Sequence, residues 1–198
     1  MTEKISIISS FYNIESVIVP IHRLSPGKLI LFIHDSEEKG IQDNVQKLKG
    51  IYGTIMEIDV TKANMYDTLT VAEKVVNCIE TEHKQGNKII VNLTGGTKIL
   101  ALGVLFGAFA RAEYIERIVY GAEKDPQLYD LPKIGYNLGE TKLKVLKELQ
   151  KDNAIVSELA KKVDITPAMA YVHLKELKSQ GYINDADQIT LAGKLALL

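Results

Sequence analysis

The sequence predicts an α/β domain built on a mainly parallel sheet, followed by a small and mostly helical domain. Over the first two thirds of the chain, apolar strand-like runs alternate with helix-like segments, which is the pattern of parallel strands joined by right-handed crossovers. After Gly139 this alternation gives way to three short helix-like segments. Because 198 residues suit one large domain or two small ones, the change predicts a domain boundary near residue 140.

The first domain, residues 1–139, is expected to be Rossmann-like. Its expected strands are residues 5–9, 28–34, 54–60, 88–93 and 117–121, and residues 128–136 could add a sixth, antiparallel strand. Its expected helices are residues 14–24, 36–52, 65–83 and 98–111. Sheets of this kind bind ligands beyond the carboxyl ends of their strands, so the loops after the strands are the expected place for a site.

The second domain, residues 140–198, has the layout of a winged helix-turn-helix. Its expected helices are residues 141–149, 155–163 and 166–180. Thr166 followed by Pro167 is a helix start, with a capping residue and then proline at the first helical position. Residues 182–183 and 189–191 are expected to pair as a hairpin. Three short helices and a hairpin within such a short stretch predict a DNA-binding module.

Composition excludes several classes of protein. The net charge of −1 excludes wholesale coating of a polyanion. The single cysteine, Cys78, allows no disulfide framework or zinc cluster within one chain, and the histidines show no metal-ligand spacing, so neither metal nor cofactor is expected. The N-terminus lacks a signal pattern, and the longest apolar run, residues 99–110, is too short to span a bilayer. We therefore expect a cytoplasmic protein with no membrane partner.

The junction between the fourth strand and its helix reads NLTGGTK, residues 92–98, and has the chemistry of an anion site. A helix N-terminus there offers unpaired N–H groups and a partial positive charge. Two glycines would let the backbone approach a ligand, two threonines would add hydroxyl groups and the lysine a full charge. The P-loop and dinucleotide-binding patterns are both absent, so a nucleoside triphosphate with magnesium is not expected. A tight glycine turn without a ligand is the alternative.

Three other features of the first domain have a possible role in ligand binding, catalysis or packing. The first strand also ends in a polar stretch, residues 9–13, which can lie close to the junction in a parallel sheet. His34 and Asp35 lie at the end of the second strand and suit either a strand-end cap or acid–base chemistry. Gly103 and Gly107 make a small-residue stripe in an apolar helix, for which packing within the chain is favoured over a subunit contact.

The NLTGGTK segment after a fourth strand, in a Rossmann-like domain that precedes a winged helix-turn-helix, resembles the CRISPR-associated Rossmann-fold (CARF) regulators. The resemblance covers essentially the whole chain. It implies that a cyclic oligoadenylate, usually the tetramer cyclic tetraadenylate, binds across the two-fold axis of a homodimer. The residues that it implies as ligand-binding are Ser9, Ser10, Phe11, Tyr12 and Asn13 in the first loop, and Asn92, Leu93, Thr94, Gly95, Gly96, Thr97 and Lys98 in the second.

Three functions remain open at this point. The leading one is a CRISPR-associated transcription regulator whose DNA affinity responds to the cyclic ligand, and in that case no residue is catalytic. The alternative is a metal-independent ring nuclease that cleaves the same ligand, with Lys98 and Ser10 as the participants. The third is a binding module that recruits other proteins.

The helix over residues 166–180 is the expected recognition helix, and promoter DNA is its expected partner. Tyr171 and Lys175 lie four residues apart and share a face, Thr166 can bond a phosphate at the helix start, and Lys178 is expected to be exposed. No arginine lies in this helix, so the strongest guanine contact is missing. Asp185 and Asp187 in the wing disfavour close approach of phosphates. A winged helix that serves protein contacts or dimerisation is the alternative.

Overall fold

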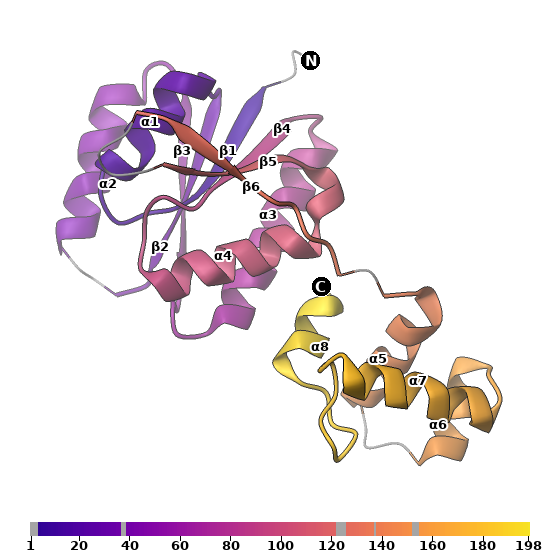
Figure 1. Cartoon of the computed structure of the whole chain (residues 1–198). Coiled ribbons are helices and arrows are strands. Elements are labelled where there is room, and N and C mark those ends of the chain that lie inside the picture. The colour runs from indigo at the N-terminus through magenta and orange to yellow at the C-terminus, as the bar shows by residue number, and fades with distance from the viewer. Residues whose placement is uncertain (1–3, 37–38, 122–125, 137, 152–154) are drawn as a thin grey trace. The chain divides into compact units, whose positions relative to one another are not determined.

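The computed structural model describes residues 4–36, 39–121, 126–136, 138–151 and 155–198. The chain divides into two compact units, Met1–Gly135 and Tyr136–Leu198, each of which is described by itself (Figure 1). None of the helices in the described ranges is both long and apolar enough to cross a membrane.

The first unit is built on a six-stranded sheet with the order β3-β2-β1-β4-β5-β6. Its strands are β1 (Ile5–Ser10), β2 (Lys28–His34), β3 (Glu57–Ala63), β4 (Lys88–Asn92), β5 (Ile115–Gly121) and β6 (Leu128–Leu131). Every neighbouring pair is parallel except β5 with β6, which is antiparallel. The predicted Rossmann-like fold with an antiparallel edge strand is thus confirmed. β1 lies between β2 and β4, which brings the ends of β1 and β4 side by side.

Helices cover both faces of this sheet (Figure 1). They are α1 (Glu15–Leu24), α2 (Lys39–Tyr52), α3 (Thr68–Lys84) and α4 (Lys98–Ala110), and a 3-10 turn, η1 (Ala112–Tyr114), precedes β5. The apolar faces of α1 and α2 pack in one core, with side chains such as Val17 and Leu48. The faces of α3 and α4 pack in the other, with side chains such as Val75 and Val104. The sheet is therefore buried on both sides, as its near-continuous apolar strands require.

The small-residue stripe of α4 packs within the chain. A Cβ built on Gly103 would lie 2.7 Å from Cγ1 of Val71, and one built on Gly107 would lie 2.6 Å from Cβ of Val75. Only glycine lets the α4 backbone approach these α3 side chains so closely. The favoured prediction for this pair, packing within the chain, is confirmed.

The second unit has its own core and the layout of a winged helix. Its helices are α5 (Glu140–Lys151), α6 (Val156–Val163), α7 (Pro167–Ser179) and α8 (Leu191–Ala196). Buried side chains of the first three helices, among them Leu146, Leu159 and Leu177, pack together with Ile183. The hydroxyl of Thr166 accepts a hydrogen bond from the N–H of Met169 at 3.2 Å, which is the predicted cap of α7. A bridge between Ile183 and Ile189 closes the predicted hairpin.

Several element bounds differ from the predictions, and hydrogen bonds explain two of these differences. The third strand begins at Glu57 rather than residue 54, because the N–H groups of Gly53, Ile55 and Met56 bond back to the last turn of α2 and hold the chain in a turn. Residue 191 was expected in a strand, but Leu191 begins α8, since the Thr190 hydroxyl accepts from the N–H of Gly193 and starts a helix there.

Candidate functional site

The two loops of the expected ligand site lie against each other at the carboxyl edge of the sheet. Ser9 and Asn92 are register partners at the ends of β1 and β4. One residue further, the hydroxyl of Ser10 donates to the carbonyl oxygen of Gly95 at 2.6 Å. Segments that are some 80 residues apart in the sequence therefore form one structure at this edge.

Asn92 holds this structure together from within. Its side chain is fully buried, and its amide nitrogen donates to Oγ of Ser9 at 2.9 Å and to the carbonyl oxygen of Ser16 at 3.1 Å. Its amide oxygen accepts from the hydroxyl of Thr94 at 2.6 Å and from the N–H of the same residue at 3.3 Å. A buried amide that is used at both ends positions the loops rather than contacting a ligand.

The hydroxyl groups of the two threonines in the segment also form hydrogen bonds with other parts of the protein. Oγ1 of Thr94 accepts from the N–H of Gly121 at 2.7 Å, which ties the loop to the end of β5. Oγ1 of Thr97 caps α4 by accepting from the N–H of Leu100 at 3.4 Å, and it also contacts Sδ of Met65 at 3.2 Å. Both hydroxyl groups therefore fix the shape of the loop, and a contact of either with an anion stays a prediction.

The glycines have a structural reason that the sequence does not reveal. A Cβ on Gly95 would lie 2.6 Å from Cβ of Ser16 and 2.9 Å from the carbonyl oxygen of Ser10. Gly96 has a φ of +80°, a conformation that other residues rarely adopt, and its Cβ would lie 3.1 Å from Cβ of Ser10. What comes close to these glycines is the first loop of the same chain, whereas the sequence suggested a ligand.

Two features of the segment remain free to meet a ligand. Lys98 is exposed, and its ammonium group has no ion-pair or hydrogen-bond partner in the part of the chain that the structure describes. The main-chain N–H groups of residues 95–98, at the start of α4, likewise have no acceptor among the described residues. Unpaired N–H groups and a free cation at a helix N-terminus favour an anion.

The first loop contributes through shape and through its outer residues. The side chains of Ser9, Ser10 and Phe11 are buried, and Phe11 packs in the core under α1 and α2. Tyr12 is exposed, and Asn13 accepts from the N–H of Ser16 through its side chain at 3.2 Å, where α1 begins. Of the five residues expected here, Tyr12 and Asn13 are the ones with side chains at the surface.

A small cavity of about 20 Å³ lies beside these loops and is lined from four strand ends. Tyr12 lies after β1, His34 ends β2, Met65 lies after β3 and Thr97 after β4. Such a volume holds about one water molecule, so a nucleotide ligand would lie over this edge rather than inside it. The cavity nevertheless marks where four loops converge.

Tyr66 has no role that the sequence predicts, because residue 65 is expected to begin a helix. The structure places α3 later, at Thr68, after a turn in which the N–H of Tyr66 donates to Oδ1 of Asn64 at 3.0 Å, and Asp67 caps the helix through the N–H of Thr70. Asn64 is a common turn residue and Asp67 a common helix-capping residue. Had both been considered, the sequence would have predicted that the helix starts after residue 67. Tyr66 therefore belongs to the loop edge of the sheet.

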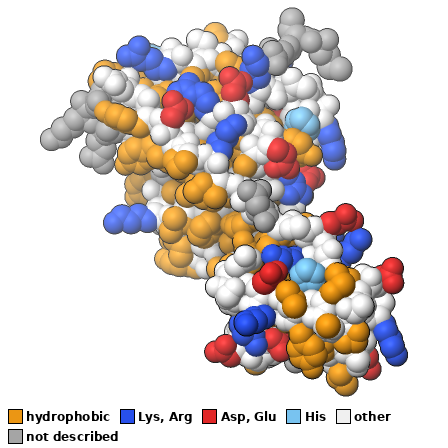
Figure 2. Space-filling view, turned by 45° about the vertical axis from the view of Figure 1, so that its right-hand side comes forward, with side chains coloured by type: hydrophobic (Ala, Val, Ile, Leu, Met, Phe, Trp, Pro, Cys, Tyr) orange, Lys and Arg blue, Asp and Glu red, His pale blue; other side chains and the backbone are white. Residues whose placement is uncertain are grey.

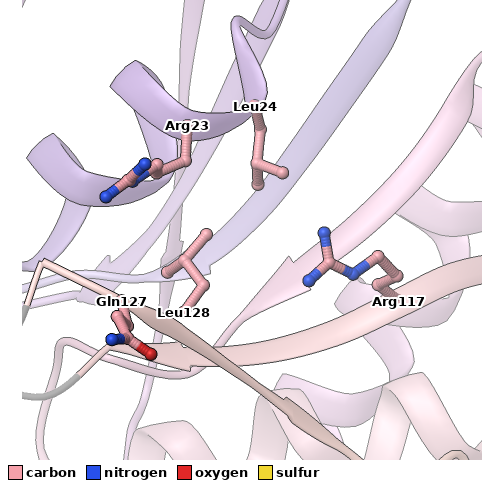
Figure 3. Close-up of a pocket in the computed structure, with 5 residues that line it drawn as sticks. All are labelled: Arg23, Leu24, Arg117, Gln127 and Leu128. Atoms are coloured by element: carbon pink, nitrogen blue, oxygen red, sulfur yellow. The ribbon is translucent and has the colours of Figure 1, made fainter.

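A larger, open pocket of about 430 Å³ lies elsewhere on this unit. Arg23 and Arg117 stand on opposite sides of it (Figure 3). Nε of Arg23 donates to the carbonyl oxygen of Pro126 at 3.3 Å, and Arg117 forms a two-point ion pair with Asp130 at 2.7 and 3.1 Å. Because both guanidinium groups have partners, this pocket is a weaker anion site than the start of α4.

In the second unit, the residues expected to touch DNA fall into two groups. Tyr171 and Lys175 are exposed on α7, and Lys175 has no ion-pair partner among the described residues. Lys178 instead pairs with Oδ1 of Asp187 at 2.9 Å and donates to the carbonyl oxygen of Asp185 at 3.1 Å. The acidic wing thus neutralises one of the cations expected on the DNA-reading helix.

Comparison with protein families gives two matches. The family model described as "HFX_2341_N:-like, N-terminal" matches residues 4–125. The model described as "Bacterial regulatory protein, arsR family" matches residues 139–185. No curated protein matches the sequence.

Solved structures of similar fold extend the comparison. Csm6 from Enterococcus italicus, bound to cyclic hexa-2'-fluoro-hexa-dAMP, has a TM-score of 0.53 at 12% identity over 90% of this chain and 52% of its own. Can2 from Sulfobacillus thermosulfidooxidans, in complex with cyclic tetra-adenylate, has a TM-score of 0.52 at 15% identity. The match covers 98% of this chain and 62% of Can2. VC1899 from Vibrio cholerae has a TM-score of 0.52 at 12% identity, and the match covers 98% of this chain and 64% of VC1899.

The chain is similar to between about half and two thirds of the length of these proteins, and at such identities the likeness shows the fold. The predicted combination, a Rossmann-like domain followed by a helix-turn-helix, is confirmed, and the second family model identifies the helix-turn-helix as one of the arsR type.

Proposed function

Since the chain belongs to the HFX_2341_N-like family through residues 4–125, and its tail matches the arsR model, we propose that it is a CRISPR-associated transcription regulator that responds to a cyclic oligoadenylate. The observation that carries the proposal is the free ammonium of Lys98 beside the unpaired N–H groups of residues 95–98. Two proteins of similar fold, Csm6 and Can2, were solved with cyclic adenylate ligands, which supports this ligand class.

The ligand that we propose is cyclic tetraadenylate, held between two copies of the chain. A ring of four identical nucleotides can present its phosphates with two-fold symmetry, so one Lys98 from each copy can meet it in the same way. Hydrogen bonds of Ser10 with Gly95 and of Asn92 with Ser9 hold the start of α4 in place. This fits the proposed role, because a phosphate binds more tightly when its donors are already positioned. No metal is needed to hold the ring in this arrangement.

The outer face of α4 is the proposed contact between the two copies. After Lys98 this helix has no charged residue, and its Leu102 side chain is 47% exposed, beside the partly buried Ile99 and Phe106. Figure 2 shows apolar side chains gathered on the surface of the first unit in this region. An exposed apolar face of this kind is characteristic of a protein interface. Because α4 starts at the ligand segment, a two-fold contact along it would bring the two segments together.

The second unit is the proposed reader of promoter DNA. Tyr171 and Lys175 are available on α7, and Thr166 stands at its start. Ligand binding can regulate DNA affinity only if two arrangements of the dimer bind the ligand differently. The absence of arginine from α7 makes weak sequence readout the expectation.

Equilibrium binding of cyclic tetraadenylate to the wild-type chain, measured by calorimetry, tests the proposal. Lys98→Ala should weaken binding about 10- to 100-fold, which is the value of a charge-assisted contact. Lys47→Ala is the matched control, because Lys47 is an exposed lysine on α2 that has no ion-pair partner among the described residues. No binding to the wild type at micromolar ligand would refute the ligand, and equal affinity of the Lys98→Ala variant would refute the phosphate site.

A second experiment, prolonged incubation with the same ligand followed by analysis of the products, separates a receptor from a ring nuclease. Of the two residues expected in a nuclease, Ser10 is buried and its hydroxyl is bonded to Gly95, so it is not placed to act on a ligand. We therefore expect the ring to be recovered intact after hours with the protein. Linear adenylate products would instead favour the enzyme.

A further inference from the structure

Three ring side chains from three different loops gather at the carboxyl edge of the sheet, beside the proposed phosphate site. Tyr12 lies after β1, His34 ends β2 and Tyr66 lies after β3. Tyr12 is 48% exposed and Tyr66 is 71% exposed, so neither ring is explained by core packing. Tyr12 and His34 line the same small cavity, and the rings of His34 and Tyr66 meet edge to face with centroids 5.8 Å apart. The three rings, which we name the aromatic cluster, thus form one surface.

The orientation of His34 in this cluster is fixed. Its Nδ1 lies 2.7 Å from Oδ1 of Asp35 and 3.5 Å from the carbonyl oxygen of Ala63. Both partners are oxygen atoms that accept hydrogen bonds, so Nδ1 carries the hydrogen. In the neutral ring, Nε2 is then a hydrogen-bond acceptor, and it has no partner in the part of the chain that the structure describes.

The aromatic cluster is continuous with the start of α4. The cavity that Tyr12 and His34 line is also lined by Thr97, the residue immediately before Lys98. Its remaining lining is apolar, from Phe11, Ile41, Met65 and Leu100. A ligand that places a phosphate on Lys98 therefore has an apolar and aromatic surface within reach of its next group.

We propose that the aromatic cluster is a purine-base subsite for the cyclic ligand, and that His34 selects adenine. The inference rests on the proposed function. The base stacks on the exposed ring of Tyr66 with Tyr12 alongside, because aromatic side chains bind unpaired bases through their faces. The 6-amino group of adenine donates to Nε2 of His34. A 6-oxo purine has an oxygen acceptor at that position. This oxygen and Nε2 of His34 would then face each other as two acceptors, with no hydrogen between them.

Binding of two rings, cyclic tetraadenylate and its 6-oxo counterpart cyclic tetrainosinate, tests both parts of the proposal. Tyr66→Ala should weaken tetraadenylate binding about tenfold, within the range that stacking contributes, while Tyr66→Phe should bind as the wild type. His34→Ala should lower tetraadenylate affinity and remove most of the preference for tetraadenylate over tetrainosinate. Ile55→Ala is the control, because this side chain is 74% exposed and precedes β3, at the edge of the sheet opposite to the aromatic cluster, and the change should leave binding of both rings unaltered.

The possible failures are distinguishable. If the wild type binds tetraadenylate and both Tyr66→Ala and Tyr12→Ala bind it equally well, the base subsite is wrong and the proposed function stands. If His34→Ala keeps the full preference for adenine, the stacking part survives and the selecting role of His34 is wrong. If the wild type binds neither ring, the proposed function fails and this inference fails with it. Thermal unfolding checks that each variant is folded, which is expected since Tyr12 and Tyr66 are largely exposed.

Discussion

The hydroxyl of Ser10 donates a 2.6 Å hydrogen bond to the carbonyl oxygen of Gly95, and so joins two loops that lie 85 residues apart in the sequence. Both groups are buried. Ser10→Ala would leave the Gly95 oxygen without this donor, which should lower the free energy of unfolding by about 1–3 kcal/mol. It should also weaken binding of cyclic tetraadenylate, because the start of α4 loses its support. Urea unfolding and calorimetry measure the two effects, and a loss of affinity without any loss of stability would mean that Ser10 contacts the ligand itself.

Gly95→Ala tests how tightly the two loops are packed. The added methyl group would meet Ser16 and the carbonyl oxygen of Ser10, so we expect a loss of about 1–3 kcal/mol of stability. Gly50→Ala on α2 is the matched control, since a Cβ there meets nothing within 4 Å and should stabilise the helix by about 0.5–1 kcal/mol. Equal stability of the Gly95→Ala variant and the wild type would show that the loops can separate freely.

Leu102→Glu tests the proposed contact between two copies. A charge at the centre of the outer face of α4 should convert a dimer to a monomer and reduce affinity for the cyclic ligand, because each ring would then meet one Lys98 instead of two. Ile51→Glu, the same kind of change on the exposed surface of α2, should leave both properties unchanged. Light scattering after size-exclusion chromatography gives the mass. A wild-type chain that is already a monomer with ligand bound would contradict the interface.

A buried carboxylate at the opposite edge of the sheet should make stability depend on acid pH. Glu82 is 2% exposed, accepts from Oγ of Ser6 at 2.6 Å and from Asn87 at 2.8 Å, and pairs with Lys28 at 3.2 Å. Burial alone would raise the pKa of Glu82, but these hydrogen bonds and the lysine charge outweigh it and hold the pKa below its ordinary value. A depressed carboxyl pKa contributes stability that is present above the ordinary value of about 4.3 and lost as pH falls through the folded pKa.

Glu82→Gln should therefore cost about 1–3 kcal/mol at pH 7, and the gap to the wild type should close below about pH 4. Glu57→Gln removes another partner of the same lysine, but Glu57 is half exposed, so the change should cost less than about 1 kcal/mol. Urea unfolding over a pH series measures both variants. A gap between Glu82→Gln and the wild type that is constant from pH 7 to pH 3 would contradict the assignment.

The two lysines of α7 should behave differently on DNA. Lys175→Ala should weaken binding of duplex DNA and reduce the slope of log affinity against log salt by about 1, as expected for one lost phosphate contact. Lys178→Ala should have a smaller effect, because the wing carboxylate of Asp187 already neutralises this lysine. Gel-shift titrations over a salt series decide between them. A salt slope near zero for the wild type would favour a winged helix that binds protein.

The fold could be predicted from the sequence because it depends on local patterns. Alternating strand and helix periods indicated the parallel sheet, and the Thr166-Pro167 start indicated α7. The predictions that differed lie where hydrogen bonds of single residues decide, as at Thr190, whose hydroxyl starts α8. Periodicity over a few residues carries no information about such caps unless the capping residue is considered together with the next three residues of the chain.

The site could be predicted only in part. The position of the NLTGGTK segment at a helix start results from the order of the elements, and Lys98 is exposed there, as its proposed role requires. The side-chain partners of Asn92 and Thr94 could not be predicted, because they depend on which strands become neighbours. Donors that suit an anion also suit a buried carbonyl group, and the residue type alone does not distinguish the two uses.

The hydrogen bond between Asn92 and Ser9 has a consequence for how the NLTGGTK motif of this chain should be interpreted. These residues are also register partners, so a slipped pairing of β1 with β4 would leave their buried polar groups unmatched. The motif is therefore needed for correct folding whatever the ligand. A descendant that no longer bound the proposed ligand would still keep Asn92 and Gly95 under selection, while Lys98 and Tyr66 would be free to drift.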